Sequence, residues 1–91
     1  MVILHNSIKE LLVKEVIMKV SERIRGLRED KGLNQTEVAK MLNTSQTVYS
    51  RYERNERDLP IDYLYTLCVF YNVTADYILG FTNDPKPLPK K

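Results

Sequence analysis

Residues 34–57, NQTEVAKMLNTSQTVYSRYERNER, predict two short helices joined by a tight turn. The first helix is expected to begin at Asn34, because Asn34 and Glu37 have the spacing of a capping box. It is expected to end at Asn43, since asparagine tolerates the left-handed conformation that often follows a helix. Within 24 residues the sequence therefore predicts a helix, a tight turn and a second helix, and the rest of the chain is interpreted around this unit.

The second helix is expected over residues 46–54, with a hydroxyl group of Thr44 or Ser45 as its cap. Tyr49 and Tyr52 share one face of this helix and are expected to point into a core. The side chains left on the outside are Gln46, Thr47, Ser50 and Arg51. A face that served only solubility would carry Lys and Glu, whereas these groups can form hydrogen bonds with base edges in a major groove.

The motifs RIRGLR, GLNQ, SRYERNER and VTADYILG occur in this order between Ser21 and Gly80, about two-thirds of the chain. Together they resemble the helix-turn-helix of the phage-repressor and Cro family, also called XRE-type regulators. The resemblance implies an all-α, five-helix lambda-repressor-like domain that binds DNA. Asn43 and Asn55 stand where the family usually has glycine, but both tolerate a positive φ.

The resemblance also implies roles for individual residues. Gln46, Thr47, Ser50 and Arg51 are expected to reach base edges. The residues expected to hold phosphates are Asn34, Gln35, Lys40, Ser45, Arg54, Asn55 and Arg57. Arg28 is expected to pair with Glu53 and so to tie the first helix to the second helix of the motif; the alternative is two solvated charges that contribute little. The expected partner is double-stranded DNA with a pseudo-palindromic operator, bound by a homodimer on half-sites about one helical turn apart.

The composition fits one small domain. The net charge is only +2, but residues 40–57 are rich in arginine, while residues 58–84 contain aspartates and no Lys or Arg. The single cysteine, Cys68, is expected to be a small buried hydrophobe, and its lack of a disulfide partner fits a cytoplasmic protein. No catalytic constellation, metal site, cofactor motif, membrane span or small-molecule ligand site is indicated, and the only histidine is His5.

The domain is expected to span residues 20–80. Its first helix is predicted over residues 20–31, with Gly32 as its stop, and its last short helix is predicted to be capped by Thr74. A fourth helix is predicted with Pro60 in its first turn. The buried face of that helix is expected to consist of Ile61, Leu64, Leu67, Cys68 and Tyr71. Tyr63 and Tyr65 are open to two interpretations, packing or a subunit contact.

Residues 1–19 lie before the resemblance and allow three interpretations. One interpretation is a packing or dimerisation helix that continues into the next one, and another is a disordered arm. Alternatively, residues 14–17 can be encoded by a purine-rich ribosome-binding sequence, which would make Met18 the natural start. Residues 81–91, FTNDPKPLPKK, are expected to be a disordered tail because their prolines prevent helix formation.

A second class of function uses the same fold for protein–protein contacts, as an antitoxin or an adaptor. Such a protein would carry a long ordered segment for its partner. The segment before Met18 is the candidate for that role, because the tail is short.

Overall fold

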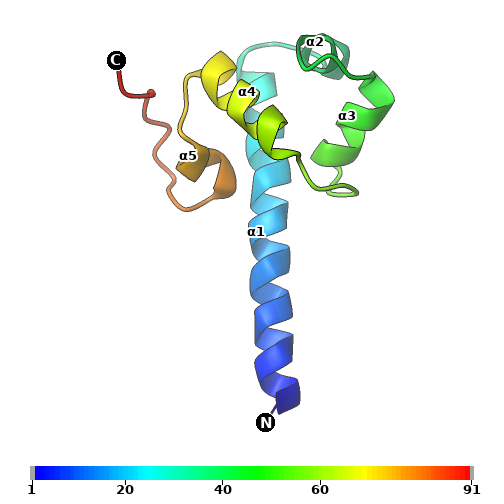
Figure 1. Cartoon of the computed structure of the whole chain (residues 1–91), viewed down its shortest axis with the longest axis vertical. Helices are drawn as coiled ribbons and strands as arrows, with labels where there is room; N and C mark the ends of the chain where they lie inside the picture. The colour runs from blue at the N-terminus through cyan, green and yellow to red at the C-terminus, as the bar shows by residue number, and fades with distance from the viewer. Residues whose placement is uncertain (1, 91) are drawn as a thin grey trace.

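The structure is a computed structural model, which describes the backbone of residues 2–90 and the side chains of residues 8–11 and 19–90. Its described residues form helices and connecting loops without strands, so the predicted all-α fold is confirmed. Five helices follow one another along the described chain (Figure 1): α1 (Val2–Asp30), α2 (Gln35–Met41), α3 (Gln46–Glu53), α4 (Ile61–Tyr71) and α5 (Ala75–Leu79).

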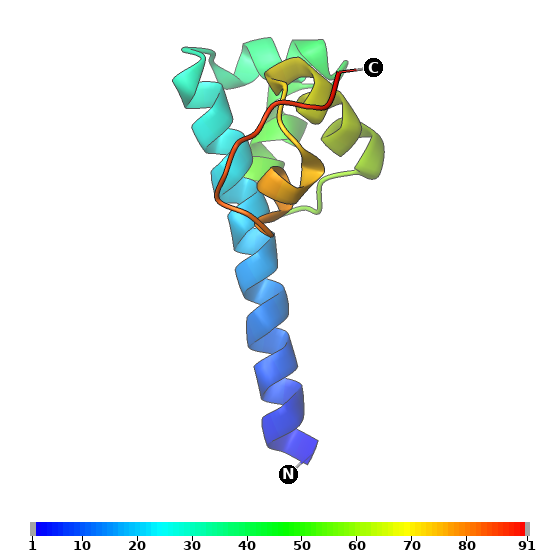
Figure 2. The ribbon, with the colours of Figure 1, turned by 90° about the vertical axis from the view of Figure 1, so that its left-hand side faces the viewer.

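Helix α1 is longer than the helix predicted over residues 20–31. Its backbone is helical from Val2 to Asp30, and its N-terminal part projects away from the other helices (Figures 1 and 2). The interpretation of this segment as a disordered arm is therefore wrong, and the expected boundary at residue 19 falls inside a continuous helix. Ile8 and Leu11 are exposed on the projecting part, whereas the side chains of residues 1–7, which include His5, and of residues 12–18 lie outside the described ones.

The predicted helix ends are confirmed at several places. The side chain of Asn34 accepts the N–H of Glu37, whose side chain accepts the N–H of Asn34, which completes the capping box. Gly32 has a φ of +69° and Asn43 a φ of 59°, so both adopt the left-handed conformation. Pro60 is a correction, because it occupies the N-cap of α4 rather than its first turn.

One core joins all five helices. Its fully buried side chains come from each of them: Ile24, Val38, Tyr49, Leu67 and Ile78. On α4, Cys68 and Tyr71 are buried and Leu64 packs at the edge, as predicted. Ile61 was placed on the wrong face by the sequence pattern, since 83% of its surface is exposed. Helix α3 packs directly against α1 in this core, and this contact fixes the position of α3.

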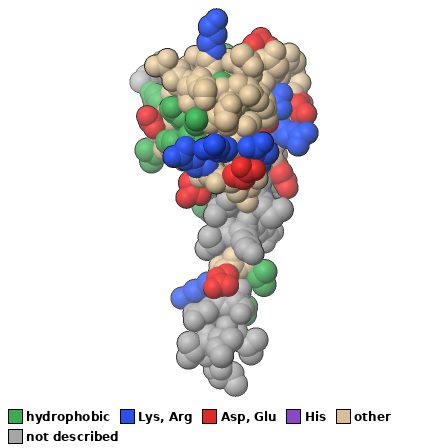
Figure 3. All heavy atoms as spheres, turned by 90° about the vertical axis from the view of Figure 1, so that its right-hand side faces the viewer, with side chains coloured by type: hydrophobic (Ala, Val, Ile, Leu, Met, Phe, Trp, Pro, Cys, Tyr) green, Lys and Arg blue, Asp and Glu red, His purple; other side chains and the backbone are tan. Residues whose placement is uncertain are grey.

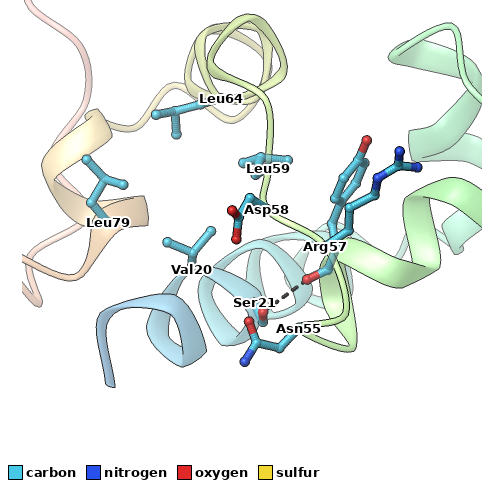
Figure 4. A pocket seen from close by; sticks show the side chains of 9 residues that line it. Val20, Ser21, Asn55, Arg57, Asp58, Leu59, Leu64 and Leu79 are labelled. Atoms are coloured by element: carbon cyan, nitrogen blue, oxygen red, sulfur yellow. Dashed lines mark hydrogen bonds between the residues drawn. The ribbon is translucent and has the colours of Figure 1, made fainter. Parts of the chain in front are cut away.

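The C-terminal end of α3 is attached to α1 beside a hollow of about 220 Å³ (Figure 4). The hydroxyl of Ser21 donates a hydrogen bond to the carbonyl of Tyr52 at 3.0 Å. Val20, Leu64 and Leu79 supply apolar walls, and the loop that follows α3 covers one side. The hydrogen bond between Ser21 and Tyr52 thus holds the C-terminal end of α3 against α1.

Residues 81–90 have no helix, as the prolines predict, but they follow a defined course along the domain (Figure 2). The guanidinium group of Arg23 stacks 4.3 Å from the ring centre of Tyr77 and donates to the side-chain oxygen of Asn83. The N–H of Leu88 donates to the side-chain oxygen of Asn72 at 3.1 Å. The prediction of a disordered tail is therefore wrong for these residues, because such contacts hold the tail against α1 and α4.

Candidate nucleic-acid interface

Helices α2 and α3 pack against each other and present the N-terminus of α3 at the surface. Ser45 is the N-cap of α3, and its side-chain oxygen accepts the N–H of Val48 at 3.1 Å. Tyr49 and Tyr52 point into the core from the inner face, as predicted. The outer face is thereby fixed in orientation by the burial of the inner one.

Gln46, Thr47 and Arg51 lie on the exposed face of α3. Thr47 and Arg51 are four positions apart and so share one side of the helix. Among the described residues, Arg51 forms no ion pair or side-chain hydrogen bond. Figure 3 shows this side of the molecule, where backbone and uncharged polar side chains occupy the centre, and Lys and Arg side chains lie at its edges together with some Asp and Glu side chains. An unpaired guanidinium on a rigid helix can donate two parallel hydrogen bonds to a guanine.

Ser50 is a correction to the predicted set. Only 6% of its surface is exposed, and its hydroxyl donates to the carbonyl of Thr47 at 2.9 Å. A serine in a helix often returns its hydroxyl to the preceding turn in this way. Ser50 therefore belongs to the inner side of α3 and is not available to a base.

Glu53, the last residue of α3, collects hydrogen bonds from three elements. Arg28 Nε and Nη2 donate to its two oxygens at 2.7 and 2.9 Å, in the bidentate geometry that is strongest for this pair. Tyr49 donates its hydroxyl at 2.5 Å and Gln35 its amide at 3.1 Å. Only 3% of the Glu53 side chain is exposed, so the alternative of two solvated charges does not describe this pair.

The ionisation of this cluster follows from its contacts. Burial alone would raise the pKa of Glu53, but the hydrogen bonds from Arg28, Tyr49 and Gln35 outweigh burial and hold that pKa below its usual value. The hydrogen bond to Glu53 raises the pKa of Arg28. Burial, together with the neighbouring carboxylate, raises the pKa of the Tyr49 hydroxyl. Around neutral pH the cluster is thus a carboxylate, a guanidinium and a neutral phenol.

Gln35 and Gln46 are joined in a way that the sequence did not predict. The amide of Gln46 donates to the side-chain oxygen of Gln35 at 2.7 Å, and Gln35 in turn donates to Glu53. The first residue of α3 is therefore connected through α2 to the Arg28–Glu53 pair. The two glutamines are eleven positions apart, a separation at which neither a single helix nor a single strand brings two side chains into contact. This connection sets the side-chain orientation of Gln46 before any ligand arrives.

The residues predicted to hold phosphates differ in the donor groups that they have left. Asn34 and Ser45 use their oxygens as helix caps, which leaves the Asn34 amide N–H groups and the Ser45 hydroxyl proton as donors. Lys40, Asn55 and Arg57 are exposed.

Arg54 is already paired with a carboxylate. Its Nε lies 2.9 Å from a carboxylate oxygen of Glu56, although both side chains remain more than half exposed. An exposed pair of this kind contributes little and is readily exchanged. Arg54 can therefore reach a phosphate only by leaving Glu56.

Other kinds of site find little support. Within the described residues, no three His, Cys, Asp or Glu side chains are grouped closely enough to hold a metal ion. Burial raises the pKa of Cys68, so its thiol is a poor nucleophile. Among the helices as far as they are described, none has the length and apolar content needed to cross a bilayer.

A comparison with known families gives a match to the family described as Helix-turn-helix, over residues 24–78. The matched range covers more than half of the chain and includes α2, α3 and the buried Glu53 cluster. The chain belongs to the XRE-type helix-turn-helix family.

Two relatives in Bacillus subtilis (strain 168) support the same membership. YobD, named an uncharacterized HTH-type transcriptional regulator, is 36% identical over 72% of this chain and 59% of its own length. ImmR, named an HTH-type transcriptional regulator, is 40% identical over 69% of this chain and 50% of its own length. The chain thus spans between half and about three-fifths of these relatives. No solved structure gives a significant match.

Proposed function

We propose that this helix-turn-helix protein binds duplex DNA sequence-specifically as a homodimer and acts as a transcriptional regulator, most simply as a repressor. The observation that carries the proposal is the outer face of α3, where Gln46, Thr47 and Arg51 are exposed on a helix whose inner face is locked into the core. Both relatives are named HTH-type transcriptional regulators, which agrees with this function.

Gln46, Thr47 and Arg51 are proposed to read base edges. Gln46 presents an amide that can bond adenine, and its hydrogen bond to Gln35 restricts the orientations it must sample before binding. Arg51 suits a guanine, because its guanidinium can pair with two acceptors at once. Thr47 can offer its methyl group to thymine or its hydroxyl to either base type. Three adjacent side chains with different preferences give a short recognition sequence.

Phosphate binding is proposed for two groups around α3. Asn34, Gln35 and Ser45 lie at the N-termini of α2 and α3, where backbone N–H groups add to the attraction for an anion. The exposed cations and amides that complete the phosphate set are Lys40, Arg54, Asn55 and Arg57. Such contacts set position and salt dependence, whereas the outer face of α3 sets sequence preference.

The proposal is tested by selection of genomic fragments on the full chain, followed by a mobility-shift titration at physiological salt. The expected result is a recurrent pseudo-palindromic sequence, bound at least 1000-fold more tightly than scrambled DNA of equal length, on the order of the usual specificity ratio. Equal affinity for both probes would refute sequence-specific binding. That result would favour the protein-binding alternative, an antitoxin or an adaptor.

A further inference from the structure

The hollow beside the C-terminal end of α3 has the size and lining of a site for a small molecule. Its volume of about 220 Å³ lies below the range of roughly 300–1,000 Å³ that is usual for pockets of drug-sized ligands. Its apolar walls come from α1, the loop after α3, α4 and α5: Val20, Leu59, Leu64 and Leu79. Such a hollow suits a compact ligand with an apolar body.

One acidic side chain, that of Asp58, lies among these apolar walls. In Figure 4 its carboxylate is seen between Val20 and Leu59, in the middle of the residues that line the hollow. Among the described residues, Asp58 forms no ion pair or side-chain hydrogen bond. The neighbouring Arg57 also lines the hollow, but its guanidinium group is directed away from Asp58 in the same view. An unpaired carboxylate beside apolar surface is complementary to an ammonium group that is attached to an apolar body.

The hollow borders the loop for which phosphate contacts are proposed. Residues 54–60 connect α3 to α4, and Asn55, Arg57 and Asp58 of this loop line the hollow. A cation bound to Asp58 offsets a negative charge close to the groups that approach DNA phosphates, which weakens the repulsion between loop and DNA. A bound ligand also restricts the loop, so less ordering remains to be done when DNA binds. Both effects strengthen DNA binding.

We propose that this hollow binds a small organic cation, an ammonium group on an apolar body, and that its occupation strengthens DNA binding. The ammonium group pairs with Asp58, and the apolar body fills the space between Leu64 and Leu79. The effect on DNA rests on the proposed function, whereas binding of the cation does not. Because the coupling between two ligands is reciprocal, DNA must raise the affinity for the cation by the same factor.

Cation binding is tested by nuclear magnetic resonance titration of the full chain with probes that share one ring: cyclohexylmethylammonium, cyclohexylmethanol and cyclohexanecarboxylate. The amide signals of Val20 and Leu79 should shift in a saturable way. The ammonium probe should bind more tightly than the alcohol by about threefold or more, on the order of the contribution of an exposed ion pair, and the carboxylate should bind most weakly. Absence of saturable shifts, or equal affinities for all probes, would overturn the proposal.

The variant Asp58→Asn removes the charge at nearly constant size. Asp58 is exposed, so the variant should keep the circular dichroism spectrum and melting temperature of the wild type. It should bind the alcohol as the wild type does but lose the preference for the ammonium probe. Asp62→Asn is the matched control, because Asp62 is also exposed but does not line the hollow, and it should keep the preference. A preference that survives in Asp58→Asn, or that disappears equally in Asp62→Asn, would refute the role of Asp58.

A filled hollow tests the site without a change of charge. In Leu79→Phe the larger ring occupies the space of the apolar body, so both the ammonium probe and the alcohol should lose their binding. Unchanged binding of both probes to a folded Leu79→Phe variant would place them elsewhere on the protein and overturn the site.

DNA binding separates this inference from the proposed function. Fluorescence anisotropy follows the titration of a duplex selected by the wild-type chain, with an equal concentration of methylammonium as the control for ionic strength. Saturating cyclohexylmethylammonium should strengthen binding of the wild type by about threefold or more and leave Asp58→Asn unchanged. An unchanged wild type would overturn the coupling. If the chain selects no DNA sequence but the ammonium probe still binds in the hollow through Asp58, the site stands and the proposed function fails.

Discussion

Removal of the Glu53 carboxylate tests how the recognition helix is held. In Glu53→Ala, the guanidinium of Arg28 loses both of its short hydrogen bonds to the carboxylate. The Tyr49 hydroxyl loses its acceptor inside the core, where the tyrosine has no exposed surface. Gln35 loses the acceptor that orients it toward α3. One substitution therefore removes a hydrogen-bond acceptor from polar groups of three helices, and Arg28 keeps only its bond to the carbonyl of Leu33, at 2.9 Å.

The expected cost is large for a domain of this size. Breaking a buried ion pair by removing one partner typically destabilises a protein by about 3–5 kcal/mol. The Arg28 side chain is 13% exposed and can recover some hydration, which places the estimate toward the lower end, about 3 kcal/mol. The free energy of unfolding of a small domain is about 5–15 kcal/mol in total, so the loss of the Glu53 carboxylate removes a substantial fraction of the stability.

Urea unfolding followed by circular dichroism measures the effect. Glu56→Ala is the matched control, because Glu56 also pairs with an arginine but is more than half exposed, and its loss should cost at most about 1 kcal/mol. If Glu53→Ala proves no more destabilising than Glu56→Ala, the cluster does not hold α3 in place.

The same cluster predicts a pH dependence. The hydrogen bonds hold the pKa of Glu53 below its unfolded value, so folding favours the deprotonated form. The resulting stability is present above the ordinary glutamate pKa of about 4.3 and is lost as the pH falls through the lowered pKa of the folded state. The difference in unfolding free energy between the wild type and Glu53→Gln should therefore narrow from about pH 5 to about pH 3. A constant difference over this range would contradict the assigned direction.

Two further substitutions test the core. Leu67→Ala should lower the free energy of unfolding by about 2–5 kcal/mol, because Leu67 is fully buried on α4. Urea titration measures this change, and a difference within error would show that the packing around Leu67 is loose. Tyr71→Phe should be neutral or stabilising by up to about 1 kcal/mol, because the buried Tyr71 hydroxyl has no hydrogen-bond partner among the described residues. A clear drop in melting temperature would contradict this, because it would show that the hydroxyl does form a hydrogen bond.

Local chemistry in the sequence predicted the helix ends well. The capping box of Asn34, the left-handed Asn43 and the glycine after α1 each depend on neighbouring residues alone. The resemblance to the family added the Arg28–Glu53 pair, whose members lie on different helices. These features are local or belong to a shared fold, which is why a single sequence is enough to predict them.

Two of the errors arose where packing decides between the sides of a helix. Ile61 is the first residue of α4, and its apolar side chain fits the spacing of the buried face. The spacing alone could not show that no other element covers the start of this helix, where Ile61 is exposed. Ser50 looked like a surface residue because it is polar, yet its size and its bond to Thr47 suit a buried position. The link between Gln35 and Gln46 depends on how α2 and α3 cross, which their separate patterns do not determine.

The role of Arg51 in sequence recognition is the central claim, and Arg51→Ala tests it most directly. The assay is a paired titration of wild type and variant on the selected operator and on scrambled DNA, with Lys40→Ala as a control for a residue assigned to phosphates. Arg51→Ala should lose about 1–3 kcal/mol on the operator and far less on scrambled DNA, whereas Lys40→Ala should lose the same amount on both. Equal losses for Arg51→Ala on the two duplexes would show that Arg51 grips only the backbone and would contradict base reading by α3.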